Sequence, residues 1–303
     1  MSTVPILDIK QFDVDREQFL SDFKAAYQEW GFAGINGHGL DPKLIESAWQ
    51  ASARFFALEI DEKLKCEGRV RGYIPFGVEK AKGASHVDLK EFFHVGRESA
   101  NIDYLDDNVW PENDADFKQT FEALYTSLDA LARRILQVFA AALELPADYF
   151  DERVAHGEAI LRILHYPPLA SNNAPNVRAA AHEDINLITL LTGSEQDGLE
   201  VLSKQGEWVP INMIEGTIIC NVGDMLQRLS NNTLRSTTHR VINPKGDQAL
   251  TSRYSIPFFM HPSPEVRLDC LPQCVNNENP RHYDPITAGV YLQQRLKEIG
   301  LVK

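Results

Sequence analysis

Apolar residues follow two kinds of spacing along the chain. Helical spacing is the more common before residue 159, and strand spacing after it. Helical spacing over 15–30, 41–56 and 114–145 predicts three amphipathic helices, and a weaker pattern predicts another at 285–298. From residue 159 onward, short apolar runs end at turn residues, which is typical of strands. These runs occur at 159–166, 182–191, 198–202, 208–211, 217–224 and 253–260, with two earlier ones at 4–9 and 32–35.

Many short strands separated by turn residues predict a mainly β fold with flanking helices. A closed or two-sheet structure such as a jelly roll suits this pattern. Such a barrel brings side chains from separate strands together at its mouth, which is where a site would form.

Composition limits the classes of function and partner. The 303 residues suffice for one large domain or two small ones, and a hydrophobic fraction of 44% with a charged fraction of 24% is that of an ordinary globular protein. The net charge of −13 argues against nucleic acid or an anionic membrane as the main partner, because phosphate binding requires a basic surface. A small-molecule partner is expected instead. The sequence does not determine the oligomeric state.

The cellular setting is predicted from the cysteines and the N-terminus. The four cysteines are sparse for this length and lack the close pairing of zinc sites, so reduced thiols are expected. The first residues lack the charged and apolar regions of a signal peptide, and no stretch approaches the roughly 18 apolar residues of a membrane span. A cytoplasmic location is therefore predicted.

A candidate metal site lies in the strand-like stretch that begins at His182. His182 and Asp184 are two positions apart, and on a strand such residues point to the same face, where both can bind one ion. His239 would complete a set of two histidines and one carboxylate. That set leaves open positions on the metal and is diagnostic of ferrous oxygenases. The pattern therefore predicts a non-haem iron enzyme that activates oxygen.

A candidate anion site follows on a later strand. Arg253 and Ser255 repeat the same two-residue spacing. A guanidinium fork and a hydroxyl side by side suit one carboxylate, which they bind through charge-assisted hydrogen bonds. The distal carboxylate of 2-oxoglutarate, whose other end chelates iron, is the expected ligand.

Five motifs stand out along the chain: Glu29-Trp30-Gly31-Phe32, Ile35-Asn36-Gly37-His38-Gly39-Leu40, Tyr166-Pro167-Pro168, Asn221-Val222-Gly223-Asp224 and His239-Arg240-Val241. Together they resemble the motifs of one family, the isopenicillin N synthase-like non-haem Fe(II)/2-oxoglutarate-dependent dioxygenases. The resemblance implies a double-stranded β-helix (jelly-roll) core with an N-terminal α/β region. It also implies that residues 1–110 form the N-terminal region and 111–303 the helix and oxygenase core, and one compact unit is expected.

The resemblance also implies roles for matching residues. His182, Asp184 and His239 match the iron ligands, Arg253 and Ser255 match the pair that binds the co-substrate, and Tyr166 matches a tyrosine that assists it. The implied cofactors and co-substrates are Fe(II), 2-oxoglutarate and O2. The implied reaction hydroxylates, desaturates or cyclises a small molecule and releases succinate and CO2.

Arg71, Tyr73 and Phe93 lie in segments that resemble those around the mouth of the site in relatives, and they are predicted to contact substrate. Two features depart from the family pattern. Leu164 replaces an asparagine that contacts the co-substrate in many plant relatives, and the segment between His239 and Arg253 is longer than usual.

Two other functions stay open at this level. One is an oxidase or synthase of the isopenicillin N synthase or ethylene-forming type, which uses related iron ligands without 2-oxoglutarate. The other is a non-catalytic protein that only holds a small ligand, which the presence of all the ligand residues disfavours. The sequence does not identify the substrate.

Overall fold

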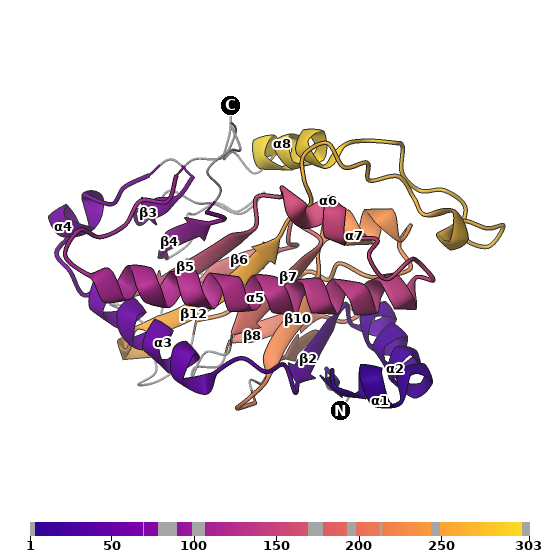
Figure 1. Ribbon diagram of the computed structural model, residues 1–303, viewed down its shortest axis with the longest axis horizontal. Helices are drawn as coiled ribbons and strands as arrows, with labels where there is room; N and C mark the ends of the chain where they lie inside the picture. The colour runs from indigo at the N-terminus through magenta and orange to yellow at the C-terminus, as the bar shows by residue number, and fades with distance from the viewer. Residues whose placement is uncertain are drawn as a thin grey trace.

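Two β-sheets with helices on one side form the structure, a computed structural model (Figure 1). It describes residues 4–68, 70–77, 90–98, 107–168, 178–192, 198–212, 214–243 and 249–298. The fold is thus mixed helix and sheet. The two sheets and the flanking helices are found as predicted, but the fold is not mainly β.

The large sheet has eight strands in the order β1-β2-β10-β7-β12-β5-β4-β3. Its neighbouring strands are antiparallel, except that β1 and β2 are parallel. The N-terminal strands lie at both edges, so the first third of the chain extends the sheet that the last half builds. The strands are β1 (Ile6–Asp8), β2 (Phe32–Asn36), β3 (Gly72–Ile74), β4 (Glu91–Gly96), β5 (Ile160–Tyr166), β7 (Ile188–Thr192), β10 (Ile218–Val222) and β12 (Arg253–Met260).

The small sheet has the order β6-β11-β8-β9 and lies against the large one. Its apolar residues Ala179, Val201 and Val241 share one buried cluster with Phe32 and Ile219 of the large sheet. That cluster fills part of the space between the two sheets. The strands are β6 (Ala179–His182), β8 (Leu199–Leu202), β9 (Trp208–Pro210) and β11 (His239–Val241).

The two faces of the large sheet differ in character, because successive side chains on a strand point to opposite faces. One face, here called the outer face, carries residues such as Ile163, Leu190 and Phe258 into the main hydrophobic core with the helices. The other, the inner face, looks toward the small sheet. Strand register places Tyr166 opposite Arg253 and Thr189 opposite Asn221 on this inner face.

Helices cover the outer face (Figure 1). The 28-residue α5 packs on β4, β7 and β12, α3 packs on β5 and β12, and α2 packs on β1 and β2. Aspartates at the N-caps of these three helices accept backbone N–H bonds, which fixes where each helix begins. The helices are α1 (Gln11–Val14), α2 (Arg16–Glu29), α3 (Pro42–Phe56), α4 (Ile60–Leu64), α5 (Ala115–Ala142), α6 (Asp151–Ala155), α7 (Asp224–Leu229), α8 (Ala288–Glu298) and the 3₁₀ turn η2 (Pro272–Cys274).

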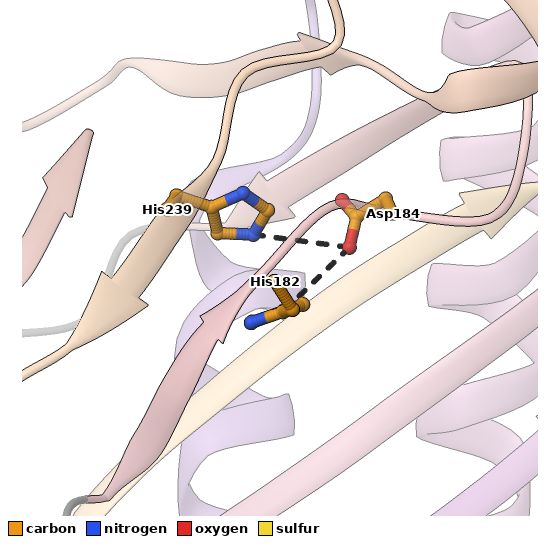
Figure 2. A group of neighbouring side chains, drawn as sticks. All are labelled: His182, Asp184 and His239. Carbon is orange, nitrogen blue, oxygen red and sulfur yellow. Dashed lines mark ion pairs between the residues drawn. The ribbon is translucent and has the colours of Figure 1, made fainter. Parts of the chain in front are cut away.

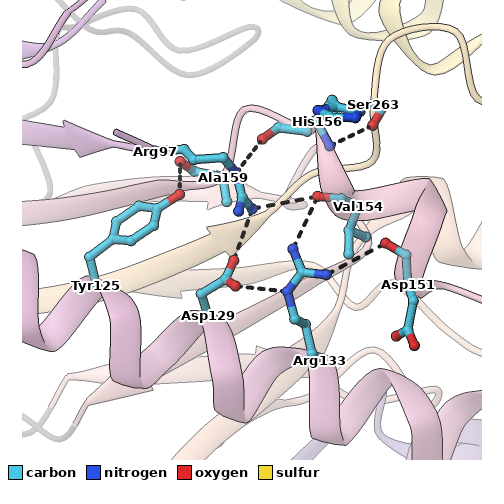
Figure 3. Close-up of polar contacts among 10 residues, drawn as sticks. Arg97, Tyr125, Asp129, Arg133, Asp151, Val154, His156, Ala159 and Ser263 are labelled. Atoms are coloured by element: carbon cyan, nitrogen blue, oxygen red, sulfur yellow. Dashed lines mark hydrogen bonds and ion pairs between the residues drawn. The ribbon is translucent and has the colours of Figure 1, made fainter. Parts of the chain in front are cut away.

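A polar cluster joins α5 to the ends of β4 and β5 (Figure 3). Asp129 on α5 accepts hydrogen bonds from Arg97 at 2.9 Å and from Arg133 at 2.7 Å. Both guanidinium groups also reach the carbonyl of Val154, and the Tyr125 hydroxyl donates to the carbonyl of Ala159 at 3.0 Å. These contacts hold the long helix in register with the sheet beneath it.

The predicted helices and most of the predicted strands are found close to their expected bounds. The main difference lies at 182–191, where β6 ends at His182 and β7 begins at Ile188, so Asp184 is in a connection and not on a strand. The lengthened segment before Arg253 includes residues 244–248, which lie outside the described residues. No helix in the described ranges is long and apolar enough to cross a membrane.

Candidate active site

Three side chains converge between the two sheets (Figure 2). The Nε2 atoms of His182 and His239 lie 3.9 and 3.8 Å from the same oxygen, Oδ1 of Asp184. One ligand atom from each residue falls within 4.8 Å of the others. This is the set that the sequence predicts.

Strand pairing brings the two histidines together. His239 at the start of β11 pairs directly with His182 at the end of β6, and their rings lie 4.4 Å apart. The edge of the Phe32 ring contacts His239 from the large sheet. Asp184 reaches them from the connection after β6, whose backbone is held by a hydrogen bond from Asp224 N to Asp184 O. The predicted strand geometry for Asp184 is therefore wrong, although the predicted neighbourhood is found.

In each of the three side chains, one polar atom is hydrogen-bonded to the protein and another is directed at the other two side chains. His182 Nδ1 lies 2.8 Å from the carbonyl of Ala180, and His239 Nδ1 lies 3.1 Å from that of Thr237. These bonds fix the ring orientations and leave both Nε2 atoms as ligands. Asp184 Oδ2 accepts bonds from Thr189 Oγ1 at 2.5 Å and Asn221 Nδ2 at 2.8 Å, which leaves Oδ1 for a cation.

The electrostatics suit a divalent cation. Burial raises the pKa of Asp184, but the two imidazoles and its hydrogen bonds lower that pKa by more, so it lies below its ordinary value. Burial and the neighbouring His239 lower the pKa of His182 to about 4, although 39% of this side chain is exposed. A carboxylate beside a neutral imidazole is the form that binds metal. The donor set and its outer contacts thus fit ferrous iron.

The predicted anion-binding residues lie together on the inner face of the large sheet. Arg253 pairs with Tyr166 and Ser255 pairs with Leu164, so the four side chains form one patch across β12 and β5. Arg253, Ser255 and Tyr166 are each no more than 4% exposed. The Arg253 guanidinium lies 5.2 Å from the centre of the Tyr166 ring.

Arg253 has hydrogen-bonding capacity that no described residue uses. Within the described part of the chain, neither its Nε nor its Nη1 has a hydrogen-bond partner. Burial lowers the pKa of this group, and Tyr166 opposes that effect. Because a buried charge with unpaired donors is costly, the geometry calls for an anionic ligand at this position.

Comparisons with known proteins identify the family of this chain. A model described as the 2OG-Fe(II) oxygenase superfamily matches residues 157–262, and a model for the N-terminal region of non-haem dioxygenases of morphine synthesis matches residues 4–113. The oxidoreductase hxnY of Emericella nidulans, described as of the 2-oxoglutarate-Fe(II) type, is 32% identical over 93% of this chain and 86% of its own. The chain belongs to the 2OG-Fe(II) oxygenase superfamily.

Solved structures of this superfamily have the same fold. A Caulobacter crescentus protein assigned to the 2OG-Fe(II) oxygenase family is 43% identical, covers 99% of this chain and 100% of its own, and has a TM-score of 0.90. A full-length Neurospora crassa protein solved in complex with alpha-KG is 31% identical, covers 96% and 95% of the two chains, and has a TM-score of 0.87. The protein is thus an Fe(II)- and 2-oxoglutarate-dependent dioxygenase, an oxidoreductase. The alternative without 2-oxoglutarate has no support among these relatives.

The structure places Tyr73 and Phe93, two of the three predicted substrate residues, away from the inner face of this oxygenase. Both are fully buried in the main core with the helices, where Phe55 contacts each ring. The Tyr73 hydroxyl donates to Glu91. Their neighbours Ile74 and Phe92 instead share a cluster with Leu164 and Tyr166 on the inner face.

Arg71, the third, lies near the polar cluster that anchors α5. Its Nη1 donates to the carbonyl of Arg97 at 3.1 Å, and its Nε lies 4.0 Å from Glu158. It packs so closely over Gly96 that a Cβ there would come within 2.1 Å of its Nε. These contacts place Arg71 beside the end of β4, where its buried Nε and Nη2 have no hydrogen-bond partner among the described residues.

A cationic side chain that the sequence offers as a possible carboxylate partner, but could not place, stands on the inner face. Arg162 lies 4.3 Å from the centre of the Phe92 ring and 5.4 Å from that of Phe259. Its Nε donates to Nε2 of His94 at 2.7 Å. Phe259 pairs with Thr189, whose hydroxyl donates to Asp184, so this aromatic and cationic group lies beside the candidate metal ligands.

A second cationic residue is Arg178, which precedes β6 and is the largest fully buried side chain among the described residues. Its guanidinium lies 5.9 Å from the Tyr166 ring, on which Arg253 also packs. Sequence reasoning missed it because residues 171–181 have the composition of a loop. The only available signal was an arginine four residues before a metal ligand.

Proposed function

We propose that His182, Asp184 and His239 bind the iron of this oxygenase and that Arg253, Ser255 and Tyr166 bind the distal carboxylate of 2-oxoglutarate. The observations that carry this assignment are two groups of side chains with atoms directed at a ligand. Two Nε2 atoms and one carboxylate oxygen face each other, and the buried Arg253 guanidinium on the inner face of the large sheet has two nitrogens without partners among the described residues.

The protein's contribution to the reaction follows from these positions. Thr189 and Asn221 hold the Asp184 carboxylate, and backbone carbonyls orient both imidazoles. Bound ferrous iron would supply open coordination positions and the redox chemistry that oxygen activation requires. Arg253 and Ser255 orient the co-substrate, and the apolar cluster around Leu164 keeps water from its carbon chain. Hydroxylation is the expected outcome, whereas desaturation or cyclisation would require a different pose of the substrate.

We assign the substrate side of the site to Phe92, Phe259 and Arg162. Two aromatic rings beside a guanidinium suit a small, flat molecule that carries a hydrogen-bond acceptor or an acidic group. The related Neurospora crassa protein was also solved with alpha-KG and thymine, which is a small molecule of this kind. Small-molecule oxidation is therefore proposed here too.

Two finer features of the fold and setting belong to the same proposal. The two facing sheets are interpreted as the jelly roll of isopenicillin N synthase-like enzymes, with residues 1–110 and 111–303 as two parts of one unit. All four cysteines are buried free thiols, which supports a reducing compartment such as the cytoplasm.

Anaerobic titration of the protein with Fe(II) and 2-oxoglutarate tests the assignment. The wild type is expected to develop the visible charge-transfer band of the chelate. Arg253→Ala is expected to need at least about tenfold more 2-oxoglutarate for the same band, because a charge-assisted pair is lost. A protein that binds Fe(II) equally well without His182, Asp184 or His239 would refute the proposed ligands.

A further inference from the structure

Two buried arginines lie near one tyrosine of the proposed co-substrate site. Arg178 is fully buried and Arg253 is 3% exposed. Their guanidinium carbons lie 5.9 and 5.2 Å from the centre of the same Tyr166 ring. The two cationic centres are therefore at most about 11 Å apart. One carboxylate bound at Arg253 lies within the field of both.

We propose that Arg178 is a second cationic residue of the co-substrate site and acts with Arg253 on the distal carboxylate of 2-oxoglutarate. The inference rests on the proposed function, since it takes Arg253 as the anchor. It adds a residue that the Arg-x-Ser pattern does not contain.

The electrostatic surroundings support this role. The chain carries a net charge of −13, yet this interior position holds two guanidinium groups. Burial and then the charge of Arg253 lower the pKa of Arg178 to about 10, so the two groups repel each other and both remain cations near neutral pH. A carboxylate bound at Arg253 would offset that repulsion, because charges interact strongly where water is excluded.

Backbone contacts direct Arg178 toward this position. Its Nη2 donates to the carbonyl of Thr251 at 3.3 Å, two residues before Arg253. Its own N–H donates to Asn243 Oδ1 at 3.0 Å, beyond the end of β11. These bonds connect β6 to the start of β12. They also define the competing role, a purely structural clamp.

A comparison of two keto acids separates these roles. 2-Oxopentanoate has the same chain length and iron-chelating end as 2-oxoglutarate but has a methyl group in place of the distal carboxylate. Dissociation constants of both acids would be measured anaerobically by the charge-transfer band of the Fe(II) protein. The proteins compared are the wild type, Arg178→Gln, Arg178→Lys and Arg253→Gln.

Arg178→Gln is expected to raise the dissociation constant of 2-oxoglutarate by about tenfold or more. The dissociation constant of 2-oxopentanoate is expected to stay within about twofold of the wild-type value. Arg178→Lys keeps the charge and is expected to recover part of the loss. Arg97→Gln, which alters an arginine of the α5 cluster, is the control and is expected to change neither constant.

If Arg178→Gln raises the dissociation constants of both acids equally, or raises neither, the proposed role of Arg178 is wrong. Failure of the proposed function gives a different result. In that case the wild type itself binds both acids equally or binds neither, and Arg253→Gln has no selective effect.

Discussion

At the scale of single residues, the two oxygens of the Asp184 carboxylate have different partners, which explains how the candidate metal site is built. One oxygen faces the two Nε2 atoms, and the other accepts bonds from Thr189 and Asn221. The grouping of His182, Asp184 and His239 was predictable from sequence, because their chemistry and order are specific. Thr189 was not, since a threonine five residues after a ligand has no signature until the turn brings the two together.

The outer contact made by Thr189 is expected to matter for metal affinity. Thr189→Val keeps the shape of the side chain and removes one of the two bonds to Asp184 Oδ2. Loss of such a contact typically weakens metal binding by about 10- to 100-fold. Anaerobic calorimetric titration with Fe(II), or with Mn(II) as an air-stable substitute, measures it.

Thr192 offers a matched control on the same strand. It is also fully buried, but it lies on the outer face and its hydroxyl donates to the carbonyl of Ile256. Thr192→Val is expected to lower stability without changing metal affinity. Equal metal affinity in both variants would show that Thr189 does not orient Asp184.

At the scale of elements, neighbouring residues on a strand face opposite sides of the sheet, so a difference of one position decides which side chains reach the site. Tyr73 and Phe93 face the helices, whereas Ile74 and Phe92 face the interior between the sheets. The sequence could not distinguish them, because a strand buried on both faces shows no alternation of polar and apolar residues. On β12 the inner face could be predicted from the sequence, because the polar side chains of Arg253 and Ser255 alternate with apolar residues that face the helices.

Paired substitutions in β4 test this register. Phe92→Leu is expected to raise the KM of whichever small molecule supports succinate release, because Phe92 forms one wall beside Arg162. Phe93→Leu is expected to leave KM unchanged and to lower the free energy of unfolding by about 1–2 kcal/mol, as a core change does. Denaturant unfolding and steady-state kinetics would be measured on both. The reverse pattern would mean that Phe93 faces the substrate.

At the scale of the whole molecule, a buried ion network ties α4 to the large sheet. Glu91 on β4 accepts bonds from Lys63 at 2.9 Å, from Tyr73 at 2.5 Å and from His165 at 2.7 Å. His165 in turn contacts Ser252 at 2.9 Å, beside the anion-binding arginine. The network therefore links the helical layer to the start of β12.

This network makes stability depend on pH in the acid range. Burial raises the pKa of Glu91, but the bonds from His165, Lys63 and Tyr73 lower it by more, so the folded pKa lies below the unfolded one. The carboxylate therefore stabilises the fold above the unfolded pKa of about 4.3, and this contribution is lost as pH falls through the folded value. Glu91→Gln is expected to cost about 3 kcal/mol at pH 7 and to flatten the acid limb of stability against pH. An unchanged acid limb in urea titrations of the variant would exclude Glu91 as its source.

Ligand binding should stabilise the whole molecule, because the site holds charges that its ligands neutralise. A ligand at 100 times its dissociation constant adds about 2.7 kcal/mol, which for a chain of this size raises Tm by about 5 °C. Fe(II) with 2-oxoglutarate is expected to give at least this shift under anaerobic conditions, and a chelator is expected to remove most of it.

Succinate alone is expected to give a smaller rise in Tm. This rise is expected to disappear in Arg253→Gln and to persist in His239→Ala, since the buried guanidinium gains a partner whether or not the metal is held. If succinate stabilises only the protein with intact iron ligands, the carboxylate binds at the metal and the unused nitrogens of Arg253 serve another group.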